Sequence, residues 1–431
     1  MTLASTAAAE SSLLLQTYDR HPVLFTRGKG VYLWDDKGKR YLDFLSGIGV
    51  NSLGHAHPAV LKAIQRQSRL MIHISNLYYH EYQSQLAKAL TQASGLDRAF
   101  FCNSGTEAWE GALKIARACG RSSYGQPKSA NTNGVAKAGK SRILALEGSF
   151  HGRTFGSLST TGQARYRDPF EPLVPGVSFV AFNDVADLER QFDSSVCALC
   201  VETIQGEGGI RPVSQQFLAR ARELTQQHGA LLILDEIQCG LGRTGRFFAY
   251  QHYGIKPDLV TVAKPLAAGI PLGAILLTDE AASAIHPGMH GTTFGGGPLA
   301  CSVALEVLRV TKAHLGRVRT TGAYFQKRLK GLAKKHSSIR EVRGLGLMLA
   351  LDLDDAAKAK GIAQQLLQSG ILINRTHETV LRFLPPFIIE KKHVDQVIRS
   401  LDAALGANQA APKIELSRST QSTSRRSRSQ K

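Results

Sequence analysis

Short apolar runs, separated by longer polar or helical segments, fill the middle of the chain from about residue 98 to residue 277. Continuous apolar strands of this kind are typical of a mostly parallel sheet that is covered by helices on both faces. We therefore predict an α/β fold whose large domain is built around such a sheet. The predicted strands are "RAFFC", "RILAL", "SFVAF", "CALCV", "LLILD", "DLVTV" and "GAILL".

Both ends of the chain have a different pattern. Residues 20–54 alternate short apolar segments with turn residues, which is typical of a small antiparallel sheet. After a long helix that begins near Pro298, short strands and helices alternate again as far as about residue 404. We predict that the two ends pack together as a smaller α+β domain. The expected divisions are 1–17 (flexible N-terminus), 18–65 (N-terminal part of the small domain), 66–315 (large domain), 316–406 (C-terminal part of the small domain) and 407–431 (disordered basic tail).

The composition of the 431 residues is that of a globular enzyme, with 43% hydrophobic and 20% charged residues. No apolar run is long enough to span a membrane. The first residues, in which Glu10 is the first charge, fit neither a secretory signal nor an Arg-rich transit peptide. The six cysteines complete no zinc site and are expected to be reduced. We therefore expect a cytoplasmic protein without a bound metal and without a membrane partner.

The net charge of +19 is unusual and would suit a nucleic-acid-binding protein. Part of this charge lies in the Ser/Arg-rich stretch "SRSTQSTSRRSRSQK", whose composition predicts disorder. The other basic residues lack interleaved aromatic residues that could stack on bases, and attraction of anionic substrates explains them equally well. We expect no specific nucleic-acid partner. Residues 122–142, rich in Gly, Ser, Asn and Lys, are predicted to form a mobile surface loop.

Three polar features directly follow predicted strands. Asp235 ends "LLILD", and it is either a surface acid or a residue of the crevice in which open α/β sheets bind their ligands. Lys264 follows "DLVTV" among small residues, where a lysine is either a solvated charge or a nucleophilic amine. Ser104 to Thr106 open a helix whose backbone amides could bind a phosphate, although such a turn is a weak signal alone.

Together these features suit pyridoxal phosphate. The aldehyde of this cofactor needs a lysine for a Schiff base, and its ring nitrogen needs a carboxylate to stay protonated. Its phosphate needs amides and hydroxyls. This combination favours a ligand crevice over a surface position for Asp235.

An ordered series of motifs supports the same chemistry. From about Tyr18 to about Leu405 the chain resembles the class III aminotransferases of the fold-type I pyridoxal-phosphate superfamily. The resemblance implies a homodimer with sites shared across its interface. It also implies transfer of the terminal amine of N-acetylornithine to 2-oxoglutarate, giving N-acetylglutamate 5-semialdehyde and glutamate, as in arginine biosynthesis. The motifs are "GKRYLDFLSGIGVNSLGHAHP", "SNLYY", "NSGTEA", "FHGRT", "ETIQGEGG", "LDEIQCGLGRTG", "AKPLAAGIPLGA", "HGTTFGGGP" and "LRFLPP".

The resemblance also assigns cofactor-binding roles. Lys264 would form the Schiff base and then carry the proton, and Asp235 would pair with the ring nitrogen. Other residues would contact the ring or the phosphate, one of them from the second subunit. These are Phe150 on the ring face, Gln238 near the ring hydroxyl, Gly105 and Thr106 at the phosphate, and Thr293 at the phosphate of the neighbouring subunit.

The substrate-binding residues implied by the resemblance are Arg153, Glu202, Thr292 and Arg382. Arg153 would bind a substrate carboxylate through its planar guanidinium. Arg382 would bind the carboxylate of glutamate or 2-oxoglutarate, and Glu202 would pair with Arg382 when the other substrate is bound.

The sequence departs from the family pattern at three places, one of which is "KPLAAG" where the family commonly has "KALGGG". Trp109 and Gly297 stand where the family usually has Asn, and Trp109 could alter the packing beneath the phosphate turn. Several alternatives stay open. The donor could be ornithine, succinylornithine, 4-aminobutyrate or a carrier-linked lysine, or the reaction could be a racemisation or decarboxylation. A non-catalytic basic binding protein is a further alternative, which the presence of Lys264 and Asp235 disfavours.

Overall fold

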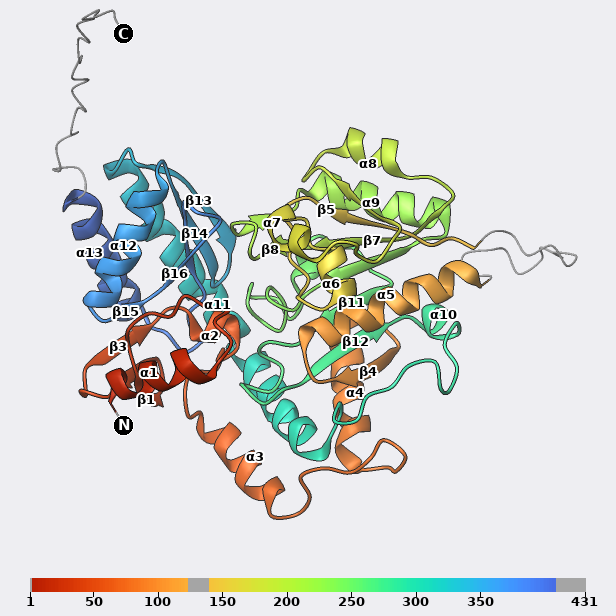
Figure 1. The fold of residues 1–431 in the computed structure, drawn as a ribbon, viewed down its shortest axis with the longest axis horizontal. Coiled ribbons are helices and arrows are strands. Elements are labelled where there is room, and N and C mark those ends of the chain that lie inside the picture. Colours follow the sequence, from red (N-terminus) through yellow and green to blue (C-terminus); the bar gives the residue numbers. More distant parts are fainter. Residues whose placement is uncertain (1, 123–138, 408–431) are drawn as a thin grey trace, which may run out of the picture.

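The computed structural model describes residues 2–122 and 139–407. A large domain surrounds a seven-stranded sheet, and a small domain contains both ends of the described chain (Figure 1). The long helix α11 (Pro298–Lys335) runs from one domain to the other. Most of the predicted loop at 122–142 and the basic tail from residue 408 lie outside the described residues.

The sheet of the large domain confirms the predicted fold class. Its order is β4-β12-β11-β10-β7-β5-β6. Strand β12 is antiparallel to both of its neighbours, and the other paired strands are parallel. The strands are β4 (Arg98–Cys102), β5 (Arg142–Leu146), β6 (Val177–Val180), β7 (Val196–Glu202), β10 (Leu231–Asp235), β11 (Leu259–Val262) and β12 (Gly273–Leu277).

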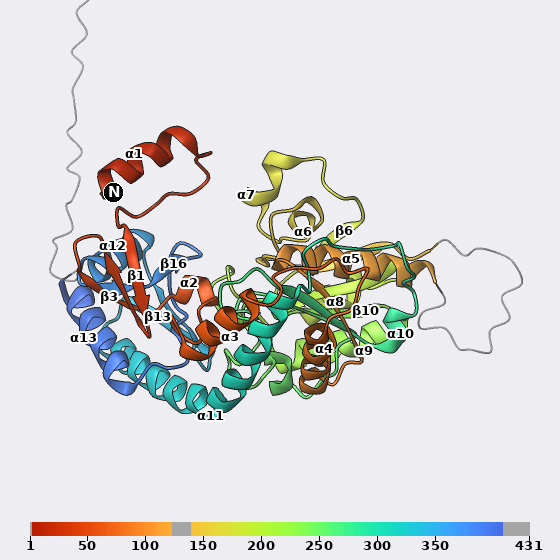
Figure 2. The ribbon, with the colours of Figure 1, turned by 90° about the horizontal axis from the view of Figure 1, so that it is seen from below.

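Helices cover both faces of this sheet, which is why every residue of β7, β10, β11 and β12 is buried. Helix α5 packs on one face, and α4 and α9 pack on the other (Figure 2). Successive residues of β10 therefore alternate between two apolar clusters: Leu231 faces α5, and Leu232 faces the opposite side. The helices of this domain are α4 (Glu81–Ser94), α5 (Gly105–Arg121), α6 (Phe155–Ser159), α7 (Ala164–Arg167), α8 (Val185–Gln191), α9 (Gln215–His228) and α10 (Asp279–Ala282).

The small domain joins the two ends of the chain in one sheet. The antiparallel strands β1 (Phe25–Lys29), β2 (Tyr32–Asp35) and β3 (Arg40–Asp43) are extended by β15 (Ile371–Leu372), which is parallel to β3. A second sheet has the order β13-β14-β17-β16. Its strands are β13 (Ile339–Leu345), β14 (Met348–Leu353), β16 (Asn374–Thr376) and β17 (Val380–Phe383). Helix α12 (Ala356–Gln368) packs on this sheet, and α13 (Lys391–Ala407) packs against α12 and α11.

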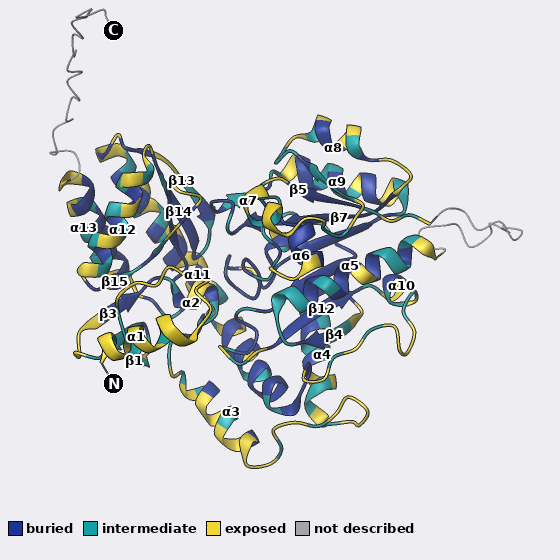
Figure 3. Ribbon diagram, in the orientation of Figure 1, coloured by how far each residue is buried: buried dark blue, intermediate teal, exposed yellow. Residues whose placement is uncertain are grey.

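The N-terminus, expected to be flexible, contains the helix α1 (Leu3–Leu13). Thr2 caps this helix, but α1 buries none of its residues and is exposed throughout much of its length (Figure 3). No helix of the described residues is long and apolar enough to cross a membrane. The remaining short elements are α2 (Ser46–Gly49), α3 (Pro58–Ser68), η1 (Asp168–Phe170), η2 (Ala249–His252), β8 (Ile204–Gln205) and β9 (Arg211–Pro212).

Candidate active site

A cavity of about 330 Å³ lies at one edge of the large sheet. The carboxyl ends of β4, β7, β10 and β11 meet at this edge, because these strands run in the same direction. The loops that follow the four strands therefore line the cavity. Seven of the predicted site residues lie in its wall: Gly105, Thr106, Phe150, Glu202, Asp235, Gln238 and Lys264.

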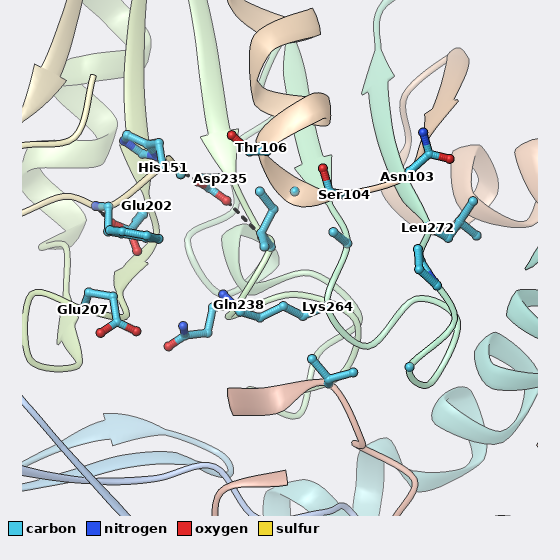
Figure 4. Close-up of a pocket in the computed structure, with 18 of the residues that line it drawn as sticks. Asn103, Ser104, Thr106, His151, Glu202, Glu207, Asp235, Gln238, Lys264 and Leu272 are labelled. Carbon is cyan, nitrogen blue, oxygen red and sulfur yellow. Dashed lines mark hydrogen bonds and ion pairs between the residues drawn. The ribbon is translucent and has the colours of Figure 1, made fainter. Parts of the chain in front are cut away.

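Asp235 is held firmly at the end of β10. One carboxylate oxygen, Oδ2, lies 2.7 Å from Nδ1 of His151, and the other accepts a hydrogen bond of 3.0 Å from the amide of Ile237. Asp235 is only 4% exposed, yet it lines the cavity. The carboxylate is thus fixed from behind and faces the space where a ligand would bind (Figure 4).

The unusual Trp109 supports this carboxylate indirectly. Its ring stacks on His151, with centroids 3.9 Å apart and planes inclined by 6°. Its indole N–H donates a hydrogen bond of 2.8 Å to the hydroxyl of Thr160. The departure from the family pattern therefore connects α5 with the imidazole that contacts Asp235. The sequence reasoning missed His151, although this residue follows Phe150 in the "FHGRT" motif.

Lys264 follows β11, and its side chain crosses the cavity toward Gln238 (Figure 4). Small buried residues, Ala263 and Ala267, lie beside it in the chain. Burial lowers the pKa of the Lys264 amine below its ordinary value, although the carboxylates of Glu207 and Asp235 act in the opposite direction. A lowered pKa makes the neutral, nucleophilic amine available closer to neutral pH.

The first turn of α5 forms an anion-binding end of the cavity. The hydroxyl of Ser104 caps the helix by accepting a hydrogen bond of 3.2 Å from the amide of Glu107. The amides of Gly105 and Thr106 belong to the first turn, where backbone N–H groups have no acceptor within the helix. A Cβ at position 105 would lie 2.9 Å from the Ile237 side chain, so a larger residue there would require that side chain to shift.

The structure corrects the predicted pairing of Arg382 with Glu202. Both oxygens of Glu202 accept backbone hydrogen bonds, from Phe150 at 2.8 Å and from Gly206 at 2.9 Å. The partner of Arg382 is Glu207, whose Oε1 lies 2.5 Å from Nη1. Because the two amides hold the Glu202 side chain, the second acid of "ETIQGEGG" faces Arg382 instead. That second acid was the signal in the sequence that could have identified Glu207.

Arg382 is fully buried at the end of the small domain that adjoins the cavity. Besides Glu207, it donates hydrogen bonds to Asn374 at 3.0 Å and to Gln238 at 3.3 Å. Burial opposes ionisation of the Glu207 carboxyl, but the Arg382 guanidinium holds the pKa of Glu207 below its ordinary value. Burial and the nearby Asp235 carboxylate raise the pKa of Glu202. The pKa values of the two glutamates are therefore shifted in opposite directions, and their partners differ.

Comparison with known proteins identifies the family. The model of the family "Aminotransferase class-III" matches residues 15–405. The chain belongs to the class III aminotransferases. It is 46% identical over 395 residues to the acetylornithine aminotransferase of Methanocaldococcus jannaschii, covering 91% of this chain and 96% of the relative. It is also 46% identical over 389 residues to the acetylornithine aminotransferase of Aquifex aeolicus, covering 90% of this chain and 98% of the relative.

Solved structures agree with this identification. The ornithine aminotransferase of Toxoplasma gondii ME49 matches with a TM-score of 0.88 and 33% identity, covering 95% of this chain and 96% of that structure. The acetylornithine aminotransferase of Elizabethkingia anophelis matches with a TM-score of 0.81 and 30% identity, covering 94% and 100%. Class III aminotransferases depend on pyridoxal phosphate.

Four residues predicted for this aminotransferase lie outside the cavity wall. Arg382 is one contact away, through Gln238 and Glu207. The Thr292 hydroxyl accepts hydrogen bonds from the Asn103 side chain and from the amide of Gly295, each at 3.2 Å. Arg153 and Thr293 are exposed. The predicted role of Thr293 requires a second subunit, so it stays a prediction.

Proposed function

We propose that this aminotransferase uses pyridoxal phosphate to transfer the terminal amine of N-acetylornithine to 2-oxoglutarate. The observation that carries the proposal is the meeting of Lys264, Asp235 and the first turn of α5 in one cavity. These groups match an aldehyde, a ring nitrogen and a phosphate respectively. The high identity to acetylornithine aminotransferases supports the choice of donor.

The cavity residues fit this cofactor. When bound, pyridoxal phosphate supplies an aldehyde that takes up the amino group and a ring that acts as an electron sink. Lys264 supplies a nucleophilic amine and then moves a proton at its Nζ. The Asp235 carboxylate holds a proton on the ring nitrogen. The residues that would hold the rest of the cofactor are Gly105 and Thr106 at the phosphate, Phe150 on the ring face and Gln238 near the ring hydroxyl.

The pair formed by Arg382 and Glu207 suits an acceptor with two carboxylates. Arg382 can bind a carboxylate of 2-oxoglutarate through two parallel hydrogen bonds. A buried guanidinium without a partner is costly, and Glu207 supplies that partner when the substrate presents no carboxylate there. Exchange between Glu207 and a substrate carboxylate lets one site accept both an acidic and a non-acidic group.

The donor carboxylate would bind Arg153. Acetylation removes the positive charge of the α-amine, so N-acetylornithine brings no unpaired ammonium into the site next to a guanidinium. Free ornithine would bring that ammonium, and two positive charges side by side repel each other. An uncharged N-acyl group and a free carboxylate are thus the features that the site favours in a donor.

We predict a higher kcat/KM for N-acetylornithine than for ornithine or 4-aminobutyrate, with 2-oxoglutarate as acceptor. Arg153→Ala should raise the KM for N-acetylornithine by about tenfold or more, since it removes a charge-assisted hydrogen bond. Steady-state kinetics with each donor tests both statements, and the KM for the acceptor is the internal control. Ornithine or 4-aminobutyrate as the better donor would contradict the proposed substrate, leaving the related ω-aminotransferases as the alternative.

We also propose a homodimer in which Thr293 of each subunit contributes to the phosphate site of the other. Several large apolar side chains are exposed in residues 70–79 and next to Thr293. They include Tyr79, Leu77, which is 86% exposed, and Phe294, which is 68% exposed. Apolar patches of this kind mark contact surfaces. The Asn76 amide joins the two segments through bonds to the carbonyls of Thr292 and Gly295.

Sedimentation of the protein should give about twice the chain mass of 46.7 kDa. Leu77→Asp should shift the protein toward the monomer and lower its activity, because it places a charge in the contact surface. A wild-type protein that sediments as a monomer at assay concentration would contradict the dimer. We expect this enzyme to act in the cytoplasm, where its six free cysteines suit a reducing environment.

A further inference from the structure

Arg153 lies beside an aromatic residue that neither the sequence motifs nor the proposed cofactor site uses. Its guanidinium carbon lies 4.0 Å from the ring centre of Tyr166, in α7, and 5.5 Å from that of Phe150. Phe150 and Tyr166 themselves meet edge to face, with ring centroids 6.0 Å apart. Phe150 lines the cavity, and its contacts with Tyr166 and with the exposed Arg153 connect the cavity wall to the surface.

Arg153 is free to bind a ligand. Among the residues that the structure describes, no carboxylate lies within ion-pair distance of it, although many other arginines of this domain pair with an acid. Its guanidinium carbon lies over the two aromatic rings. An aromatic ring attracts the positive charge of arginine without taking up its N–H donors in hydrogen bonds to an oxygen, so these donors stay available for a carboxylate.

We propose that Tyr166 is a positioning residue that determines the affinity for donors carrying a distal carboxylate. An exposed arginine samples many rotamers, and binding a carboxylate orders it at a cost in free energy. The Tyr166 ring orders the guanidinium beforehand and so removes part of that cost. This inference rests on the proposed function, since it assumes that the carboxylate of the donor binds Arg153.

A matched control lies next to Tyr166 in the chain. The Arg165 guanidinium also lies over the Tyr166 ring, at 4.8 Å, but it donates hydrogen bonds of 3.1 Å to Gln163 and to the Tyr166 hydroxyl. Arg165→Ala therefore removes a positive charge and a contact of the same ring but keeps both residues of the contact between Arg153 and Tyr166. It separates the effect of a stacked Arg153 from a general loss of charge near the cavity.

The first test compares Tyr166→Leu, Tyr166→Phe and Arg165→Ala with the wild-type holoenzyme. Tyr166→Leu should raise the KM for N-acetylornithine by about two- to fivefold, with kcat and the acceptor KM unchanged. Tyr166→Phe keeps the ring and should restore most of the donor affinity. An unchanged donor KM in Tyr166→Leu, or an equal rise in Arg165→Ala, overturns the inference.

The second test removes one partner of the interaction at a time. In the Arg153→Ala background, adding Tyr166→Leu should cause no further rise in the donor KM. With N-acetyl-1,4-diaminobutane, which is the same donor without its carboxylate, Tyr166→Leu should leave kcat/KM unchanged. A loss that persists in either case means that Tyr166 acts structurally. If Arg153→Ala itself leaves the donor KM unchanged, the proposed donor site is wrong; if only Tyr166→Leu has no effect, the inference alone fails.

Discussion

Lys264→Ala is expected to lower kcat by about 10⁴-fold or more, because general acid–base catalysis alone contributes up to that factor and the amine is also the nucleophile. The fold should persist. The Lys264 side chain is largely enclosed in the cavity, and burial disfavours its charged form. Replacing it with alanine therefore removes the free-energy cost of desolvating the amine. The expected result is thus a folded protein without turnover.

The measurement combines steady-state turnover, thermal unfolding and the visible absorbance of bound pyridoxal phosphate. The absorbance that depends on attachment to a lysine should disappear in Lys264→Ala. Lys256→Ala is the control, because Lys256 is exposed and lies near the start of the same strand, β11. Substantial turnover by Lys264→Ala, or an equal loss in Lys256→Ala, would refute the role of Lys264.

The sequence predicted the site well where strand direction alone decides the position. Asp235 and Lys264 each follow a buried apolar strand, and β10 and β11 are parallel neighbours. Their carboxyl ends must therefore lie side by side, whatever the details of the loops. The same logic placed the first turn of α5 at the cavity, whereas Glu202 was assigned only through the resemblance to the family. Apolar patterning was sufficient for these positions because it specifies which strands are buried on both faces.

The sequence did not predict contacts in which the direction of a side chain decides its partner. Glu202 ends β7 and Glu207 follows β8, and backbone amides hold the first acid while the second reaches Arg382. The contact between Trp109 and His151 joins residues from different elements and leaves no periodic pattern. Strands β15 and β3 are far apart in the chain. The sequence predicted that the two ends of the chain pack together, but not that these two strands pair in parallel.

Asp235→Asn is expected to retain the fold but to lower kcat by about a hundredfold or more, the scale observed when one preorganised electrostatic contact is removed. A neutral amide cannot hold a proton on the cofactor ring nitrogen. His151 can change tautomer to accept a hydrogen bond from the new amide, because its Nε2 has no other partner among the described residues. We therefore expect a loss in the free energy of unfolding of only about 1–2 kcal/mol.

The adjacent acid provides the control for this prediction. Glu236 is fully buried, but its carboxylate accepts hydrogen bonds from the amides of Ala249 and Tyr250 at 2.8 and 2.9 Å and from Thr203 at 3.0 Å. Glu236→Gln should reduce the free energy of unfolding, because one acceptor becomes a donor facing N–H groups, while kcat changes little. Kinetics and denaturant unfolding of both variants separate the two acids. If Asp235→Asn turns over at nearly the wild-type rate, then Asp235, like Glu236, serves only to hold the end of β10 in place.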